Sequence, residues 1–229
     1  MKKLTVCLTR NERIWGWIYL AVQILALPTA VQLINLILGS PLSDAQLNFI
    51  FFCINFICIT VIFHRFLLDC GRISVAQPWL CLRYAGQGLL LYWLGSFLVG
   101  LLIGALYPDF SNVNDESIAH MTQQNYTLMS FGTVLLVPVV EETLYRGVVF
   151  GVLYERSRVA AFVVSTLAFA ALHVVSYIGY YEPLYLLVCF VQYIPAGLCL
   201  AWAYVKADSI WAPILMHITI NQIGILSMR

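Results

Sequence analysis

Residues 84–107 read YAGQGLLLYWLGSFLVGLLIGALY, an apolar stretch without a single charged side chain. A helix needs about 20 such residues to cross the hydrocarbon core of a bilayer, so this stretch predicts a membrane-spanning helix. Apolar stretches of similar length recur along the chain. They cover residues 16–38, 47–63, 126–154, 159–181, 183–205 and 209–228. The sequence therefore predicts an all-α polytopic membrane protein with about seven transmembrane helices.

The composition also indicates a chain that is embedded in a lipid bilayer. Hydrophobic residues make up 62% of the 229 residues and charged residues only 10%, whereas soluble domains contain roughly 25% charged residues. The formal net charge of +1 gives no electrostatic basis for binding nucleic acid. We therefore expect an integral membrane protein with the bilayer as a partner and no nucleic-acid partner. No repeat or linker divides the chain, which favours a single membrane domain over residues 1–229.

The loops between the apolar stretches differ in charge, and this difference predicts the orientation of the chain, because cytoplasmic loops are enriched in Lys and Arg. If the N-terminus is cytoplasmic, ten of the twelve basic residues fall on that side: Lys2, Lys3, Arg10, Arg13, Arg65, Arg72, Arg83, Arg156, Arg158 and Lys206. The outer loops then hold Asp44, Asp109, Asp115, Glu116 and Glu182, and Arg229 ends the chain on the same side. We therefore expect a cytoplasmic N-terminus, an outer C-terminus and a polar outer loop over residues 108–125.

The stretch 126–154 places three charged side chains, Glu141, Glu142 and Arg146, at membrane depth. A charge at the bilayer centre costs at least about 2.5–3.5 kcal/mol, so these residues need partners and are functional candidates. Glu142 and Arg146 are four residues apart on one helical face, which favours an ion pair. Glu141 points about 100° away and is left as the unpaired carboxylate. Pro138 removes a backbone donor just before them, which predicts a kink that could admit water.

Two histidines also lie in apolar stretches, His173 and His217, each near the middle of its predicted helix. Asn221 follows His217 by four residues, so both side chains project from the same helical face. Phe169 precedes His173 by four residues and is expected to form a wall of the same site. One intramembrane histidine usually forms a hydrogen bond between helices. Two histidines with an asparagine and an unpaired glutamate favour a chemical site over a structural latch.

These side chains suit hydrolysis in two ways, between which the residues do not decide. Glu141 with a histidine can take a proton from water and return it to a leaving amine. Asn221 and the other histidine can then donate hydrogen bonds to the oxyanion. Alternatively, Glu141, His173 and His217 could bind Zn²⁺, with water completing the coordination sphere. The sequence contains no HExxH motif, so a helical zincin site is excluded.

Three short motifs resemble those of the CAAX protease and bacteriocin-processing family, also called the CPBP or Abi family. PVVEETLYRG over residues 138–147 is similar to its EExxxR motif, FAALH over residues 169–173 to FxxxH, and HITIN over residues 217–221 to HxxxN. The motifs occur in the order of the family. The resemblance covers residues 126–226, which it identifies as the catalytic core, preceded in residues 1–125 by three helices and the outer loop.

The resemblance implies an intramembrane endopeptidase that cleaves a membrane-anchored peptide or protein, prenylated or leader-bearing. It makes Glu141 the general base together with His173, and it assigns the oxyanion to His217 and Asn221. Supporting positions fall to Pro138, Glu142, Tyr145, Arg146 and Phe169. Such enzymes have been described both as metalloproteases and as metal-free glutamate enzymes, so zinc remains an alternative. The short chain resembles prokaryotic members, which implies a prokaryotic cell membrane.

Two other functions are compatible with the sequence. A non-catalytic protein, for bacteriocin immunity or as a signalling scaffold, could retain the family site without cleaving anything. Glu, His and Arg within a membrane also mark proton-coupled transporters, although the sequence shows no inverted repeat. The leading hypothesis is a protease that cleaves near the cytoplasmic half of the membrane.

Overall fold

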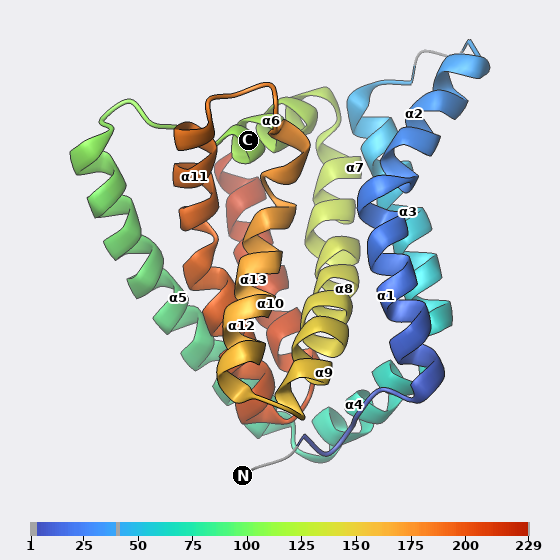
Figure 1. The fold of residues 1–229 in the computed structure, drawn as a ribbon. Coiled ribbons are helices and arrows are strands. Elements are labelled where there is room, and N and C mark those ends of the chain that lie inside the picture. Colours follow the sequence, from blue (N-terminus) through green and yellow to red (C-terminus); the bar gives the residue numbers. More distant parts are fainter. Residues whose placement is uncertain (1–3, 40–41, 229) are drawn as a thin grey trace.

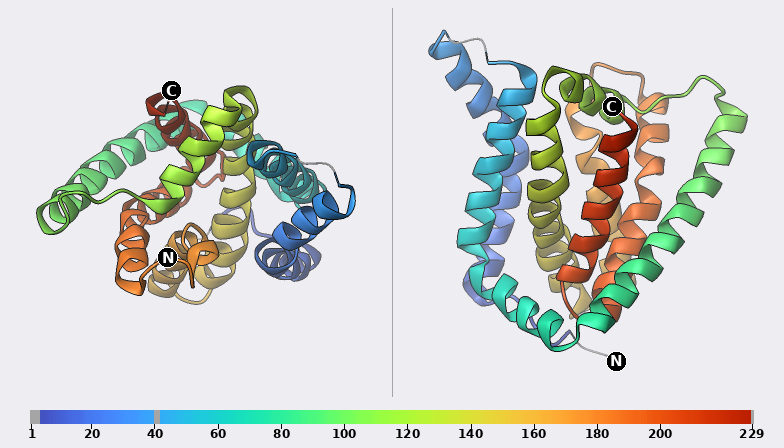
Figure 2. Two further views of the ribbon diagram at one scale, coloured as in Figure 1. Left: turned by 90° about the horizontal axis from the view of Figure 1, so that it is seen from above. Right: turned by 180° about the vertical axis from the view of Figure 1, so that it is seen from behind.

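The computed structural model describes residues 4–39 and 42–228, whose regular structure is helical (Figure 1). Lys2, Lys3 and Arg229, which entered the predicted orientation, lie outside the described residues. The first helices are α1 (Arg10–Leu25), α2 (Leu27–Ile37), α3 (Asp44–Ile62), α4 (His64–Ala76), α5 (Pro78–Leu106) and α6 (Val113–Gln124). Helices α4 and α6 lie across opposite ends of the bundle, and α5 leans away from the other long helices (Figures 1 and 2).

One long helix follows, Tyr126–Tyr154, in which α-helical and π-helical turns alternate. Its parts are α7 (Tyr126–Phe131), a first π-helical segment (Gly132–Leu136), α8 (Val137–Glu142), a second π-helical segment (Thr143–Phe150) and α9 (Gly151–Tyr154). The first π-helical segment stands directly before the turn that contains Pro138. The predicted disturbance behind this proline is therefore a widened helical turn, a feature that is frequent at functional sites.

Four helices complete the chain: α10 (Arg158–Leu172), α11 (Pro183–Gln192), α12 (Ile194–Ala207) and α13 (Trp211–Ser227). Helix α10 is shorter than the predicted stretch 159–181, because it ends at Leu172 and a 3₁₀ turn follows at Val175–Tyr177. Gly179, with a φ of 90°, then lets the chain reverse before α11. His173 forms the C-terminal cap of α10. The prediction that His173 lies near the middle of its helix is therefore wrong.

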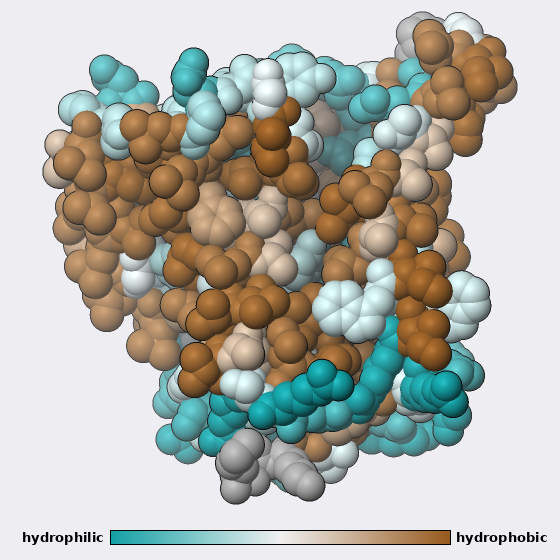
Figure 3. Space-filling view, in the orientation of Figure 1, coloured by the Kyte–Doolittle hydropathy of each residue, from teal (hydrophilic) through white to brown (hydrophobic). Residues whose placement is uncertain are grey.

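The helices have the length and composition of a membrane protein. Among the described residues, four helices are long and apolar enough to span a bilayer: α3, α5, Tyr126–Tyr154 and Pro183–Ala207, which joins α11 and α12. Helices α1 and α2 meet at a bend of 48° and make a fifth if they are one span. Apolar side chains cover the middle of the surface, and hydrophilic ones gather at the ends (Figure 3). The all-α membrane fold is thus confirmed.

Two segments that the sequence predicted as loops form helices. Residues 64–76 become α4, and much of the expected outer loop becomes α6. Helix α6 begins where the side chain of Asn112 accepts a hydrogen bond from the backbone N–H of Asn114, which is a standard helix cap. Because α6 crosses the end of the bundle where α13 ends (Figure 1), it can contribute side chains to a site between the central helices.

Small residues allow the central helices to approach closely. A Cβ atom added to Gly197 on α12 would lie only 2.8 Å from the methyl group of Thr166 on α10. A Cβ atom on Gly88 of α5 would lie 2.8 Å from the sulfur of Met216 on α13. Such contacts are typical of helix interfaces in membranes, where burial of apolar surface does not by itself hold helices together. They fix the distances between the helices that carry the site.

Candidate active site

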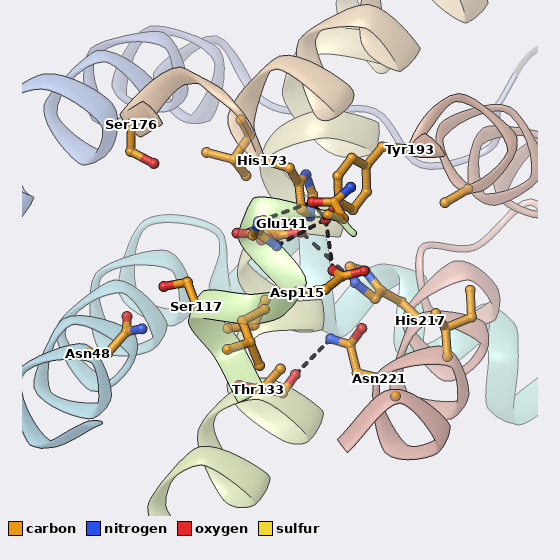
Figure 4. Close-up of a pocket in the computed structure, with 18 of the residues that line it drawn as sticks. Asn48, Asp115, Ser117, Thr133, Glu141, His173, Ser176, Tyr193, His217 and Asn221 are labelled. Atoms are coloured by element: carbon orange, nitrogen blue, oxygen red, sulfur yellow. Dashed lines mark hydrogen bonds and ion pairs between the residues drawn. The ribbon is translucent and has the colours of Figure 1, made fainter. Parts of the chain in front are cut away.

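A cavity of about 840 Å³ lies between the central helices. Glu141 on α8, His173 at the end of α10, and His217 and Asn221 on α13 all line it (Figure 4). Three separate parts of the chain therefore bring the four residues of the predicted site to one space.

The side chain of Glu142 is fully buried and contacts both Arg146 and His217. One carboxylate oxygen, Oε2, lies 3.2 Å from Nε of Arg146, which is the ion pair that the helical spacing predicted. The other, Oε1, accepts a hydrogen bond of 2.8 Å from Nδ1 of His217. The sequence did not predict this second partner, because His217 lies on a distant helix. Glu142 therefore neutralises Arg146 and fixes the ring of His217.

Arg146 is also fully buried and has further compensation for its charge. Its Nη2 donates a hydrogen bond of 3.2 Å to the carbonyl oxygen of Gly197. Its guanidinium carbon lies 4.3 Å from the centre of the Phe169 ring, a cation–π contact. A buried cation is tolerated only with such partners, so Arg146 is a structural member of the site.

Phe169 forms the wall that its spacing predicted. The centre of its ring lies 4.8 Å from that of His173 and 5.9 Å from that of His217. Tyr145 packs edge-on against the same ring at 5.9 Å. One aromatic ring thus packs against both imidazoles.

Glu141 is the carboxylate without a hydrogen-bond partner. Its side chain is 12% exposed, and its buried Oε2 makes no hydrogen bond. Nε2 of His217 lies 3.9 Å from this oxygen, which is longer than a hydrogen bond. His173 makes no ion-pair contact with Glu141 within 4.0 Å in the part of the chain that the structure describes. Because Nδ1–H of His217 is held by Glu142, this ring can exchange a proton only at Nε2, the atom near Glu141.

His173 is oriented by the backbone and by a second aromatic ring. Its Nδ1 donates a hydrogen bond of 2.9 Å to the carbonyl oxygen of Phe169, which leaves Nε2 for chemistry. The ring stacks on Tyr193, with ring centres 4.0 Å apart and planes inclined by 22°. The Tyr193 hydroxyl donates to Oδ1 of Asp115 at 3.0 Å and accepts from Nδ2 of Asn114 at 3.1 Å. Helix α6 is therefore linked to His173 through Tyr193.

The sequence did not predict Tyr193 or Asp115 as site residues. Tyr193 lies in a uniformly apolar stretch, where an aromatic side chain normally contacts lipid or core. The one available signal was Asn112 followed by Asp115 and Glu116, a pattern typical of a helix start. Desolvation by the surrounding protein raises the pKa of the Asp115 carboxyl above its ordinary value, although the hydrogen bond from Tyr193 acts in the opposite direction.

Asn221 connects α13 to the helix that carries Glu141. Its Nδ2 donates a hydrogen bond of 2.8 Å to the carbonyl oxygen of Thr133 in the first π-helical segment. A primary amide has two N–H groups, so one remains for a bound oxyanion.

The candidate zinc ligands Glu141, His173 and His217 do not form a closed three-ligand cluster in the described chain. Within residues 4–39 and 42–228, no group of three His, Cys, Asp or Glu side chains is placed to hold one metal ion. The hydrogen bond from Nδ1 of His217 to Glu142 leaves Nε2 as the open nitrogen of that ring.

We predict that Tyr193→Phe lowers turnover severalfold, because His173 keeps its stacked ring but loses the connection to α6. The variant should also be less stable by about 0.5–1.5 kcal/mol, the usual net value of a hydrogen bond. Cleavage kinetics and thermal unfolding in detergent measure the two effects.

Tyr185→Phe is the matched control, since the Tyr185 hydroxyl donates a 2.7 Å hydrogen bond to the carbonyl of Ser111, just before α6. Within the described chain, Tyr185 makes no hydrogen bond or ring contact with His173. Equal turnover in the two variants would show that Tyr193 does not position His173.

The family model described as Rce1-like, type II CAAX prenyl endopeptidase, matches residues 123–223. This range contains Glu141, His173, His217 and Asn221, and it leaves out residues 1–122. No curated protein and no solved structure matches the chain significantly.

Proposed function

Because residues 123–223 belong to the Rce1-like family of type II CAAX prenyl endopeptidases, we propose that this protein is an intramembrane endopeptidase. Its substrate is a membrane-associated peptide or protein. The observation that carries the proposal is the unpartnered Oε2 of Glu141, in a cavity that two imidazoles also line. A buried carboxylate oxygen without a hydrogen bond is costly inside a membrane protein, and its presence is explained if Glu141 accepts a proton during catalysis.

In the proposed reaction, Glu141 takes a proton from a water molecule, and the water oxygen attacks the carbonyl carbon of the substrate. The peptide C–N bond then breaks, and the proton passes from Glu141 to the leaving amine. His217 assists Glu141, because Glu142 leaves only its Nε2 free to exchange a proton. The family resemblance gave that role to His173. Asn221 donates a hydrogen bond to the oxyanion that forms when water attacks. The free Nε2 of His173 can take up and release a proton at the same site.

The proposal includes seven membrane crossings with the start of α1 in the cytoplasm. Seven results if α1–α2 and α11–α12 are single crossings and α10 and α13 are short ones. The start of α1 and the end of α13 lie at opposite ends of the bundle (Figure 1), as an odd number requires. We also propose a prokaryotic cell membrane as the location.

Cleavage of membrane-anchored peptides by the purified full-length protein, with and without a metal chelator, tests the proposal. We expect cleavage, and we expect the chelator to leave the rate unchanged. A rate that falls with the chelator and returns with Zn²⁺ would contradict the metal-free reaction, while leaving hydrolysis in place.

A non-catalytic immunity or scaffold protein would give a different result. Replacement of Glu141, His173 and His217 together would then leave the biological phenotype intact. Such an outcome, with no cleavage by the original chain, would contradict the proposed enzyme.

A further inference from the structure

The two ends of the bundle carry net charges of opposite sign, although Glu12, Asp69, Glu155 and Asp208 also lie at the end where α1 begins. Outside the helix Tyr126–Tyr154, the Lys and Arg residues of the described chain all lie at the end where α1 begins, here called the basic end. They are Arg10, Arg13, Arg65, Arg72, Arg83, Arg156, Arg158 and Lys206. Figure 3 shows a dense belt of hydrophilic side chains there. The opposite, acidic end contains Asp44, Asp109, Asp115, Glu116 and Glu182. The positive-inside rule places the basic end in the cytoplasm.

The cavity that contains Glu141 extends towards the acidic end. Its wall includes Asp44 in the first turn of α3, Asp115 in the first turn of α6 and Ser227 in the last turn of α13. No Lys or Arg of the described chain lines it. Among the described side chains, the cavity therefore contacts one end of the molecule and not the other.

The core is closed between Glu141 and the basic end. The side chains of the second π-helical segment, Thr143–Phe150, are all buried. They pack against α12, where Leu200 is 0% and Tyr204 is 2% exposed. A second cavity of about 510 Å³ lies at the basic end, but none of its lining residues is shared with the first. A substrate on the cytoplasmic side would have to displace this packed layer.

We propose that the substrate reaches Glu141 from the extracytoplasmic side of the membrane, and not from the cytoplasmic side that the sequence suggested. This inference rests on the proposed function and concerns the substrate class of the same site. A packed layer closes one route, whereas the other route is lined by polar as well as apolar side chains and reaches the exposed residues Asp44 and Ser227.

The side chains that line the cavity also restrict the class of substrate. Without Lys or Arg in the wall, no permanently charged cation is available to pair with the C-terminal carboxylate of a substrate. Arg146 does not line the cavity and is paired with Glu142. Asp44, Asp115 and Glu141 instead attract positive charge. The site therefore takes a neutral or basic extracytoplasmic segment of a membrane-associated peptide, and it cleaves an internal bond.

Labelling of introduced cysteines with a membrane-impermeant maleimide tests the side of access in the full-length protein. Asp109→Cys marks the acidic end, Arg156→Cys the basic end and Ser117→Cys the cavity wall. The parent chain gives the background of the native cysteines. In intact cells we expect labelling at positions 109 and 117, and at position 156 only in inverted membranes. Labelling of positions 109 and 117 only in inverted membranes would overturn the proposed access.

A pair of membrane-anchored peptides tests the substrate class in detergent, where both ends are accessible. The two share one scissile sequence and differ only in flanking Lys or Glu residues. We expect kcat/KM to be about tenfold higher for the Lys peptide at low ionic strength, with a smaller difference in salt. Equal or faster cleavage of the Glu peptide would overturn this class. Neither result depends on the Glu141→Gln variant, whose full activity would contradict the proposed function itself.

Discussion

Glu141→Gln is expected to lower the turnover of a membrane peptide by about 10²–10⁴-fold, the usual contribution of a general base. Glutamine has nearly the same shape as glutamate but cannot take a proton from water. Because Oε2 of Glu141 has no hydrogen-bond partner, the amide breaks no existing hydrogen bond at that oxygen. The variant should therefore fold with undiminished thermal stability. Single-turnover cleavage and thermal unfolding in detergent measure the two parts of this prediction.

Asp115→Asn is the matched control, since Asp115 is a second carboxylate of the same cavity. Asparagine can still accept the hydrogen bond from the Tyr193 hydroxyl through its side-chain oxygen. We expect a much smaller loss of turnover than for Glu141→Gln. Full turnover of Glu141→Gln, or equal losses in both variants, would rule out Glu141 as the base.

Glu142→Ala is expected to destabilise the protein by about 3–5 kcal/mol, because it leaves Arg146 as a buried charge without its partner. The same change leaves Nδ1 of His217 without an acceptor, so turnover should fall as well. The yield of folded protein and the unfolding free energy in detergent measure the first effect. Replacing Arg146 by alanine in the same chain should recover part of the stability.

The exposed pair Asp69 and Arg72 provides the comparison. These residues are also joined by an ion pair within one helix, at 2.7 Å, but their side chains are 46% and 79% exposed. Asp69→Ala should cost less than about 1 kcal/mol, because water screens the pair. If Glu142→Ala costs no more than Asp69→Ala, or if the double variant recovers nothing, the coupling of Glu142 and Arg146 is absent.

The fold was largely predictable where it depends on the sequence of a single helix. Long uncharged stretches gave the membrane helices, since length and apolarity are local properties. The prediction failed where a contact outside the helix decides. Apolarity alone predicted a helix over 159–181, but the chain turns after Leu172, and Gly179 takes a φ of 90°. The polar segment 108–125 was expected to be a loop. The Asn112 cap is a local signal for its helix α6, but the contacts with Tyr193 that hold this helix in place are not encoded locally.

The sequence by itself determined that charges lie within the membrane, that Glu142 pairs with Arg146, and that Glu141 points elsewhere. These results follow from 3.6 residues per turn and need no second helix. Only the tertiary structure decided that His217 takes the free oxygen of Glu142, that Tyr193 stacks on His173, and that the cavity faces the acidic end. In lipid, the apolar faces of a helix differ little in the free energy of contacting lipid or another helix. Hydrophobicity therefore does not determine which helices pack together. Close side-chain packing, such as Thr166 against Gly197, makes that choice, and it depends on the whole chain at once.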